Sequence, residues 1–131
     1  MRFARLALIL LALPAVAAAF AGASLPSALH GSGLWEVGKS ASGTGSQRRC
    51  LSDPAILAQW EHAGDQCTRV VVATGTSSSE VHYTCTNGGF GTSHIRLLTP
   101  RSLRIETQGI ANGYPFGYTL HARRVGNCPA R

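Results

Sequence analysis

Residues 80–125 decide the fold, and they read EVHYTCTNGGFGTSHIRLLTPRSLRIETQGIANGYPFGYTLHARRV. Apolar and polar side chains alternate along most of this stretch, which is the pattern of strands that bury one face. Turn-forming sequences interrupt the alternation at Asn87-Gly88-Gly89, Pro100-Arg101 and Asn112-Gly113. We therefore expect antiparallel strands joined by short turns, over residues 80–86, 92–99, 102–108 and 116–125.

The turns also predict which residues face each other on neighbouring strands. Closing each turn by a short loop places Ile95 between Val81 and Ile105. It also places Ile105 opposite Leu120. A shift of one residue would turn every side chain to the other face, so the agreement of three turns supports these registers. The predicted buried face consists of Val70, Val72, Val81, Tyr83, Cys85, Ile95, Leu97, Leu103, Ile105, Tyr118 and Leu120.

The preceding residues predict three more strands and one helix. We expect the strands at 34–37, 47–51 and 68–73. Ser52-Asp53-Pro54 is typical of a helix start, because a side-chain oxygen can cap the first turn and proline suits its first position, and Gly64 marks the end. The predicted fold is mainly β: a single curled antiparallel sheet or small β-barrel with one short helix, stapled by disulfides.

The chain is long enough for one small domain. We place this domain at residues 33–128. Residues 24–32 are small, polar and marked by proline and glycine, so we expect a flexible lead-in there. Residues 129–131 form a short tail.

The first 23 residues show the three-part pattern of a secretory signal peptide. Arg2 and Arg5 give a basic head, and an uncharged segment rich in leucine and alanine follows. Small residues then occur at the spacing of a cleavage site, so we expect cleavage after Ala21 or Ala23. An uncleaved anchor would have to span the membrane with residues 6–23, which is about the minimum length. The sequence therefore predicts an exported, periplasmic protein with no membrane span after cleavage.

Four cysteines follow the signal segment: Cys50, Cys67, Cys85 and Cys128. An even number in an oxidising compartment predicts two disulfides, and the absence of any CxxC pair disfavours zinc. We favour Cys50–Cys67, which brackets the helix, with Cys85–Cys128. At about 3.3 Å per strand residue, however, Cys85 and Cys128 would lie at opposite ends of the sheet. The pairing Cys67–Cys85 with Cys50–Cys128 therefore stays open.

The face opposite the predicted core collects ionisable side chains. Imidazole and carboxylate groups there could hold a transition metal, and arginines could bind phosphate or carboxylate. Ordinary cross-strand ion pairs account for the same pattern, and arginines would repel a metal cation. We therefore expect no metal and treat these residues as a candidate polar-face cluster: His82, His94, Arg96, Arg104, Glu106, His121 and Arg123.

The motifs of common catalytic sites are missing from the sequence. It contains no GxSxG, P-loop, HExxH or strand–helix GxGxxG motif. Ser93 and His94 are adjacent, but neighbouring strand residues point to opposite faces and cannot pair. Oxidised cysteines cannot serve as nucleophiles. We therefore expect a protein that is not an enzyme and needs no cofactor.

The chain is basic, with a formal net charge of +6 at pH 7. Arg48-Arg49 and Arg123-Arg124 would suit nucleic acid, but export and the lack of interleaved aromatic residues argue against it. The excess of arginine over lysine suits forked contacts to phosphate groups, although it also fits simple solubility. The partners we expect are an anionic envelope component, an apolar ligand or a periplasmic protein, and no nucleic acid.

Three segments occur in a recognisable order: Gly33-Leu34-Trp35-Glu36-Val37, Cys50-Leu51-Ser52-Asp53-Pro54 and Arg123-Arg124-Val125-Gly126-Asn127-Cys128. In this order they resemble the small exported proteobacterial proteins grouped as domain-of-unknown-function family 3617. The resemblance covers residues 33–128 and implies a periplasmic location and a disulfide-stapled β domain. It implies no activity and no catalytic residues. Residues 40–47 are rich in glycine and serine here, whereas many relatives are Met-rich there, so no property of that segment carries over.

These features favour a small non-catalytic periplasmic binding or interaction module of the cell envelope. One alternative is an inhibitor or protector of an envelope hydrolase. The other is a metal-using enzyme built on His82, His94, His121 and Glu106.

Overall fold

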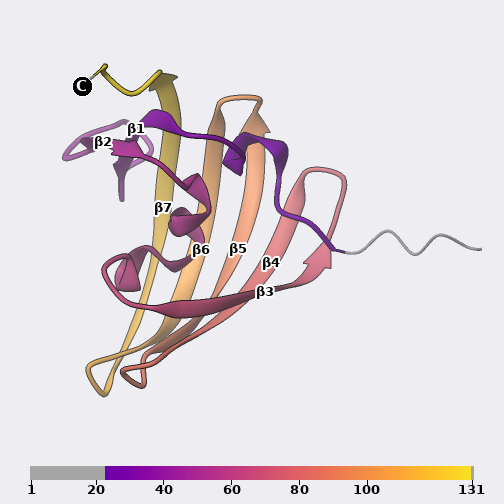
Figure 1. The fold of residues 1–131 in the computed structure, drawn as a ribbon, viewed down its shortest axis with the longest axis vertical. Helices are drawn as coiled ribbons and strands as arrows, with labels where there is room; N and C mark the ends of the chain where they lie inside the picture. Colours follow the sequence, from indigo (N-terminus) through magenta and orange to yellow (C-terminus); the bar gives the residue numbers. More distant parts are fainter. Residues whose placement is uncertain (1–22, 131) are drawn as a thin grey trace, which may run out of the picture.

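The computed structural model describes residues 23–130, so the predicted signal peptide lies outside the described residues except for Ala23. The chain forms one seven-stranded antiparallel sheet in the order β2-β1-β7-β6-β5-β4-β3 (Figure 1). Its elements are η1 (Ser27–Leu29), β1 (Gly33–Gly38), β2 (Gln47–Leu51), η2 (Pro54–His62), β3 (Cys67–Thr74), β4 (Ser78–Cys85), β5 (Phe90–Thr99), β6 (Ser102–Ala111) and β7 (Tyr114–Gly126). The prediction of a mainly β fold with one short helix is confirmed, and the sheet is curled and open rather than closed into a barrel.

The helical segment η2 packs against β4, β5 and β6 and lies over one face of the curled sheet (Figure 1). Asp53 caps it by accepting a hydrogen bond from the Ala55 amide at 3.1 Å, and Pro54 occupies its first turn, as predicted. Beneath it lie fully buried apolar side chains of the sheet, including Val81, Ile105 and Leu120. The alternating pattern therefore does bury one face of the strands, and η2 completes the core.

Two of the three predicted registers are confirmed. Ile105 pairs with Ile95 on β5 and with Leu120 on β7. Between β4 and β5 the prediction is wrong by two residues, because Val81 faces Ser93 rather than Ile95. The loop that joins these strands is longer than predicted: the Cys85 amide donates to the Gly89 carbonyl at 2.8 Å. An even shift keeps every side chain on its face, so the predicted core survives the error.

On β3 the predicted orientation is wrong. Val70 and Val72 were expected in the core, but they are 55% and 46% exposed. Cys67 lies directly opposite Cys85, whose inward orientation turns Arg69 and Val71 towards η2. Arg69 is held there by hydrogen bonds to Gln59 at 2.7 Å and Asp53 at 3.0 Å. Three consecutive valines give no alternation, so local sequence alone cannot choose the face.

The segment that composition marks as a flexible lead-in packs onto the domain. Leu29 in η1 is only 1% exposed and belongs to the core cluster. The Ser24 carbonyl accepts a hydrogen bond from the Ser79 hydroxyl at 2.8 Å. Burial of Leu29, packing of Leu25 and Ala28 against the core, and hydrogen bonds together offset the entropy of ordering this segment, which the polar composition does not reveal.

The first and last strands in sequence, β1 and β7, lie side by side near the edge of the sheet that β2 forms. Glu36 on β1 forms an ion pair with Arg123 on β7 at 3.4 Å. A Cβ atom at Gly33 would collide with the Arg124 guanidinium, which donates to the Ser32 carbonyl at 3.0 Å. The Gly-x-Trp-Glu and Arg-Arg segments of the sequence therefore form a single seam between β1 and β7.

Two disulfides staple the sheet. The terminal staple, Cys50–Cys128, joins β2 to the segment after β7, and the hairpin staple, Cys67–Cys85, joins β3 to β4. The favoured prediction of Cys50–Cys67 with Cys85–Cys128 is therefore wrong, and the alternative pairing is confirmed. Both Cys50 and Gly126 flank Leu34 of β1, so the chain after β7 reaches Cys50 and stays far from Cys85.

Candidate functional site

A cavity of about 910 Å³ lies between the β1–β2 hairpin and η2. Buried side chains of the sheet line part of it: Val37, Leu51 and Leu120. Half-buried Ile56 and Trp60 of η2 line it from the other side. Its size falls in the range of small-molecule sites, about 300–1,000 Å³. We call this space the hairpin cavity.

Two basic side chains of the β1–β2 hairpin also line this cavity, and each lies over an aromatic ring. The Arg49 guanidinium lies 5.9 Å from the centre of the Trp60 ring. The Lys39 ammonium lies 4.1 Å from the centre of the Tyr118 ring. Both distances suit cation–π attraction, which holds a cationic group beside an apolar surface.

The hairpin cavity carries an uncompensated positive charge. Its one acidic residue, Asp53, already pairs with Arg69 at 3.0 Å. Among residues 23–130, Lys39 and Arg49 form no ion pair, and Arg49 donates only to the neutral Gln47 side chain at 3.1 Å. A ligand with an anionic group would therefore find two free cations at the edge of an apolar surface.

Beneath η2 lies a set of buried polar side chains. The Ser93 hydroxyl is fully buried and donates to the Ala58 carbonyl at 2.7 Å. His62, only 4% exposed, contacts the Tyr83 hydroxyl through Nδ1 at 3.0 Å, whereas its buried Nε2 has no hydrogen-bond partner. Burial, with a contribution from the nearby Glu61 carboxylate, raises the pKa of Tyr83 to about 12. These groups anchor η2 to the sheet.

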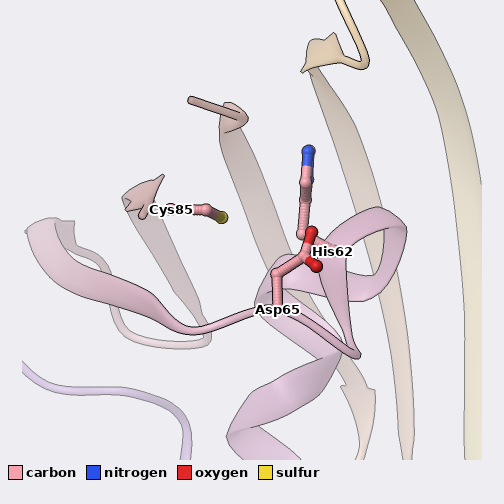
Figure 2. Close-up of side chains that lie close together, drawn as sticks. All are labelled: His62, Asp65 and Cys85. Atoms are coloured by element: carbon pink, nitrogen blue, oxygen red, sulfur yellow. The ribbon is translucent and has the colours of Figure 1, made fainter. Parts of the chain in front are cut away.

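At the end of η2, His62 and Asp65 approach Cys85 of β4, as Figure 2 shows. One donor atom of each residue lies within 4.8 Å of the others, which is the grouping expected of a metal site. Cys85 is bonded to Cys67, however, and a disulfide sulfur cannot act as a thiolate ligand. In the oxidised protein this group therefore keeps only two ligating side chains.

The candidate polar-face cluster lies on the face of the sheet away from η2, and its members form ion pairs instead of converging on one point. Glu80 contacts His82 at 2.8 Å and His94 at 3.6 Å. Arg104 pairs with Glu106 at 2.6 Å. His121 lies opposite Arg104, Arg96 lies on the other side of Arg104, and Arg123 pairs with Glu36.

Because β4 and β5 pair two residues away from the predicted register, two members of this cluster do not face each other. His82 was expected opposite His94, but it lies opposite Thr92. Three arginines remain on the same face, so a bound cation would be repelled there. Exposed ion pairs of this kind each add little to stability. The arrangement suits a solvated surface better than a metal or catalytic site.

Sequence reasoning did not find the hairpin cavity. Lys39, Arg49 and Trp60 are distant in sequence and show no shared motif. They meet because the β1–β2 hairpin lies beside η2, which follows β2 after two residues and places Trp60 under Arg49. One signal was present: Trp60 is a large aromatic residue on a short helix, and its ring is only half-buried.

Comparison with known proteins yields no match: no family model, curated protein or solved structure is similar to this chain. The resemblance to domain-of-unknown-function family 3617 therefore stays a prediction. Among the described residues, the structure contains no helix long and apolar enough to cross a membrane.

Proposed function

We propose that this protein is a non-catalytic binding module of the periplasm and that the hairpin cavity is its ligand site. The observation that carries this proposal is the cavity itself, of about 910 Å³, which has an apolar part at Leu51, Ile56 and Trp60 beside polar groups. Two of the polar groups are cationic side chains that form no ion pair within residues 23–130. Ligand sites in proteins combine apolar surface with placed polar groups. Two disulfides suit a protein that works in an oxidising compartment after export.

The chemistry of the cavity favours an amphipathic anion. An acyl chain or a ring system would cover Leu51, Ile56 and Trp60, and a carboxylate or phosphate would contact Lys39 and Arg49. Arginine binds either oxyanion through two parallel hydrogen bonds. A neutral ligand of the same shape would lack these contacts and would bind less tightly.

Tryptophan fluorescence offers a direct test with a medium-chain fatty acid anion, decanoate. Trp60 lines the cavity, whereas Trp35 is 0% exposed in the core, so a saturable change assigned to Trp60 would report occupancy. We expect Trp60→Phe to abolish the signal. We expect Arg49→Gln to weaken binding about three- to tenfold, in line with the loss of one charge-assisted contact.

A matched control is Arg101→Gln, which removes the same charge from an exposed turn outside the cavity. The proposal requires decanoate to bind more tightly than decanol and Arg101→Gln to leave the affinity unchanged. Equal weakening by the two arginine substitutions would mean that only net charge attracts the anion. Equal affinity for decanol and decanoate would remove the anionic part of the proposal.

A further inference from the structure

The hairpin staple has chemical neighbours that the terminal staple lacks. His62 and Asp65 place a ring nitrogen and a carboxylate oxygen within 4.8 Å of the Cys85 sulfur (Figure 2). Among the described residues, no comparable group of histidine and acidic side chains surrounds Cys50 or Cys128. This difference is independent of the hairpin cavity and of the function proposed for it.

The second observation is that one ring nitrogen of His62 is buried without a hydrogen-bond partner. The side chain is 4% exposed, Nδ1 contacts the Tyr83 hydroxyl at 3.0 Å, and Nε2 is buried without a partner. When the Tyr83 hydroxyl donates to Nδ1, the ring proton lies on Nε2. A buried N–H group without an acceptor destabilises the fold, so a new acceptor nearby would be favourable.

We propose that Cys67–Cys85 is an exchange-active disulfide that reacts with small thiols, with Cys85 as the leaving thiolate beside His62. This role goes beyond ligand binding in the hairpin cavity. In this reaction each Cys67–Cys85 disulfide is reduced once by external thiols, without catalytic turnover.

The reaction would proceed in two balanced steps. An external thiolate attacks the Cys67 sulfur and forms a mixed disulfide, while the electron pair of the broken bond moves to the Cys85 sulfur. That thiolate would accept a hydrogen bond from His62 Nε2–H and then take up a proton from solvent. A second external thiol then attacks the mixed disulfide, which releases the Cys67 thiol and an oxidised disulfide of the reagent.

The difference in exposure between the two cysteines determines which sulfur an external thiol attacks. Cys67 is half-buried at the start of β3, whereas Cys85 is buried at 9% exposure. An external thiol therefore reaches Cys67 first, and the buried sulfur leaves. A leaving thiolate that is stabilised by a hydrogen-bond donor leaves faster, which accelerates exchange.

Three other titratable groups face this corner. Asp65 lies within 4.8 Å, and its negative charge opposes a thiolate on Cys85. Glu61 lines the same small cavity at the end of η2 as His62 and Asp65, and its carboxylate adds a second negative charge to this corner. Tyr83 stays neutral at ordinary pH because burial raises its pKa, so its hydroxyl keeps a proton that it can donate to Nδ1.

Reduced glutathione provides the test on the folded, oxidised protein. After timed exposure, free thiols are blocked with a maleimide and each cysteine is assigned by peptide mass spectrometry. We expect the glutathione adduct on Cys67. We also expect His62→Phe to lower the reduction rate of the hairpin staple, relative to that of the terminal staple, by about tenfold.

His82→Phe is the matched control, because it makes the same replacement on β4 but on the face away from η2. It should leave the ratio of the two rates unchanged. The rate of the terminal staple serves as an internal measure of any general loss of stability in His62→Phe. An adduct on Cys85, or a ratio that His62→Phe leaves unchanged or raises, would overturn the proposal.

Discussion

The two disulfides of this domain differ in the length of chain that they close and in the side chains around them. The terminal staple closes a loop with a sequence separation of 78 and secures the seam between the two ends of the domain. The hairpin staple has a separation of 18 and joins two strands that are already neighbours. One bridge therefore contributes mainly chain connectivity, whereas the other lies among His62, Asp65 and Tyr83. Equivalent covalent bonds can thus serve a mechanical role in one place and a chemical role in another.

The largest test of this contrast replaces each bridge by a pair of serines. In the chain-entropy model, Cys50→Ser/Cys128→Ser should cost about 4–5 kcal/mol and Cys67→Ser/Cys85→Ser about 3 kcal/mol. The difference follows from the longer loop that the terminal staple closes in the unfolded chain. Urea denaturation of both double variants measures the free energies of unfolding. A larger cost at the hairpin staple would show that native contacts around His62 outweigh loop entropy.

A second test concerns the buried phenol near the hairpin staple. The pKa of Tyr83 is raised to about 12, above the value of about 10 in an unfolded chain. The folded protein therefore holds this proton more tightly, and the resulting stability is complete below about pH 10. It should be lost as the pH rises from about 10 to 12, by roughly 2–3 kcal/mol in total. Urea midpoints in this range should fall less in Tyr83→Phe than in the parent protein.

Tyr83→Phe also supplies the spectroscopic control for that titration. The parent protein should show a phenolate absorbance that appears at about pH 12 and that this variant lacks. The same absorbance change at about pH 10 would show that the corner behind the hairpin staple is open to water.

The smallest expected effect on stability comes from adding a methyl group at Gly89, beside His62. A Cβ atom at Gly89 would overlap the His62 imidazole, so Gly89→Ala must displace that ring at a cost of about 1–3 kcal/mol. Gly126→Ala is the control at the other corner, because nothing lies within 4 Å of the position of its Cβ. Thermal unfolding should distinguish the two variants. Equal melting temperatures would mean that His62 is loosely held.

Much of the fold could be predicted from residues 80–125, because strict alternation and short turns restrict side-chain orientation. Ile95, Ile105 and Leu120 lie in the core as their spacing indicates. Val70 and Val72 were misplaced because an uninterrupted run of valines carries no period. There, a tertiary constraint from Cys67 opposite Cys85 decides the orientation.

The candidate sites were harder to predict than the fold. The members of the polar-face cluster share one face of the sheet, but the pairing of β4 with β5 differs from the prediction by two residues, so His82 does not lie opposite His94. The hairpin cavity depends on how far β2 approaches η2, which no local pattern encodes. The group at Cys85 requires the end of η2, its following turn and β4 to meet, and only the folded sheet brings them together.

The pairing of β1 with β7 also determines when the two disulfides can form during synthesis. A chain that emerges from its N-terminus completes β1 and β2 long before β7 exists to pair with them. During that interval Cys50 has no Cys128 to join, and Cys67 is the nearest thiol along the chain. Until Cys128 is made, Cys50 therefore has no native partner, whereas Cys67 and Cys85 can already form their bridge, so the hairpin staple can close before the terminal staple.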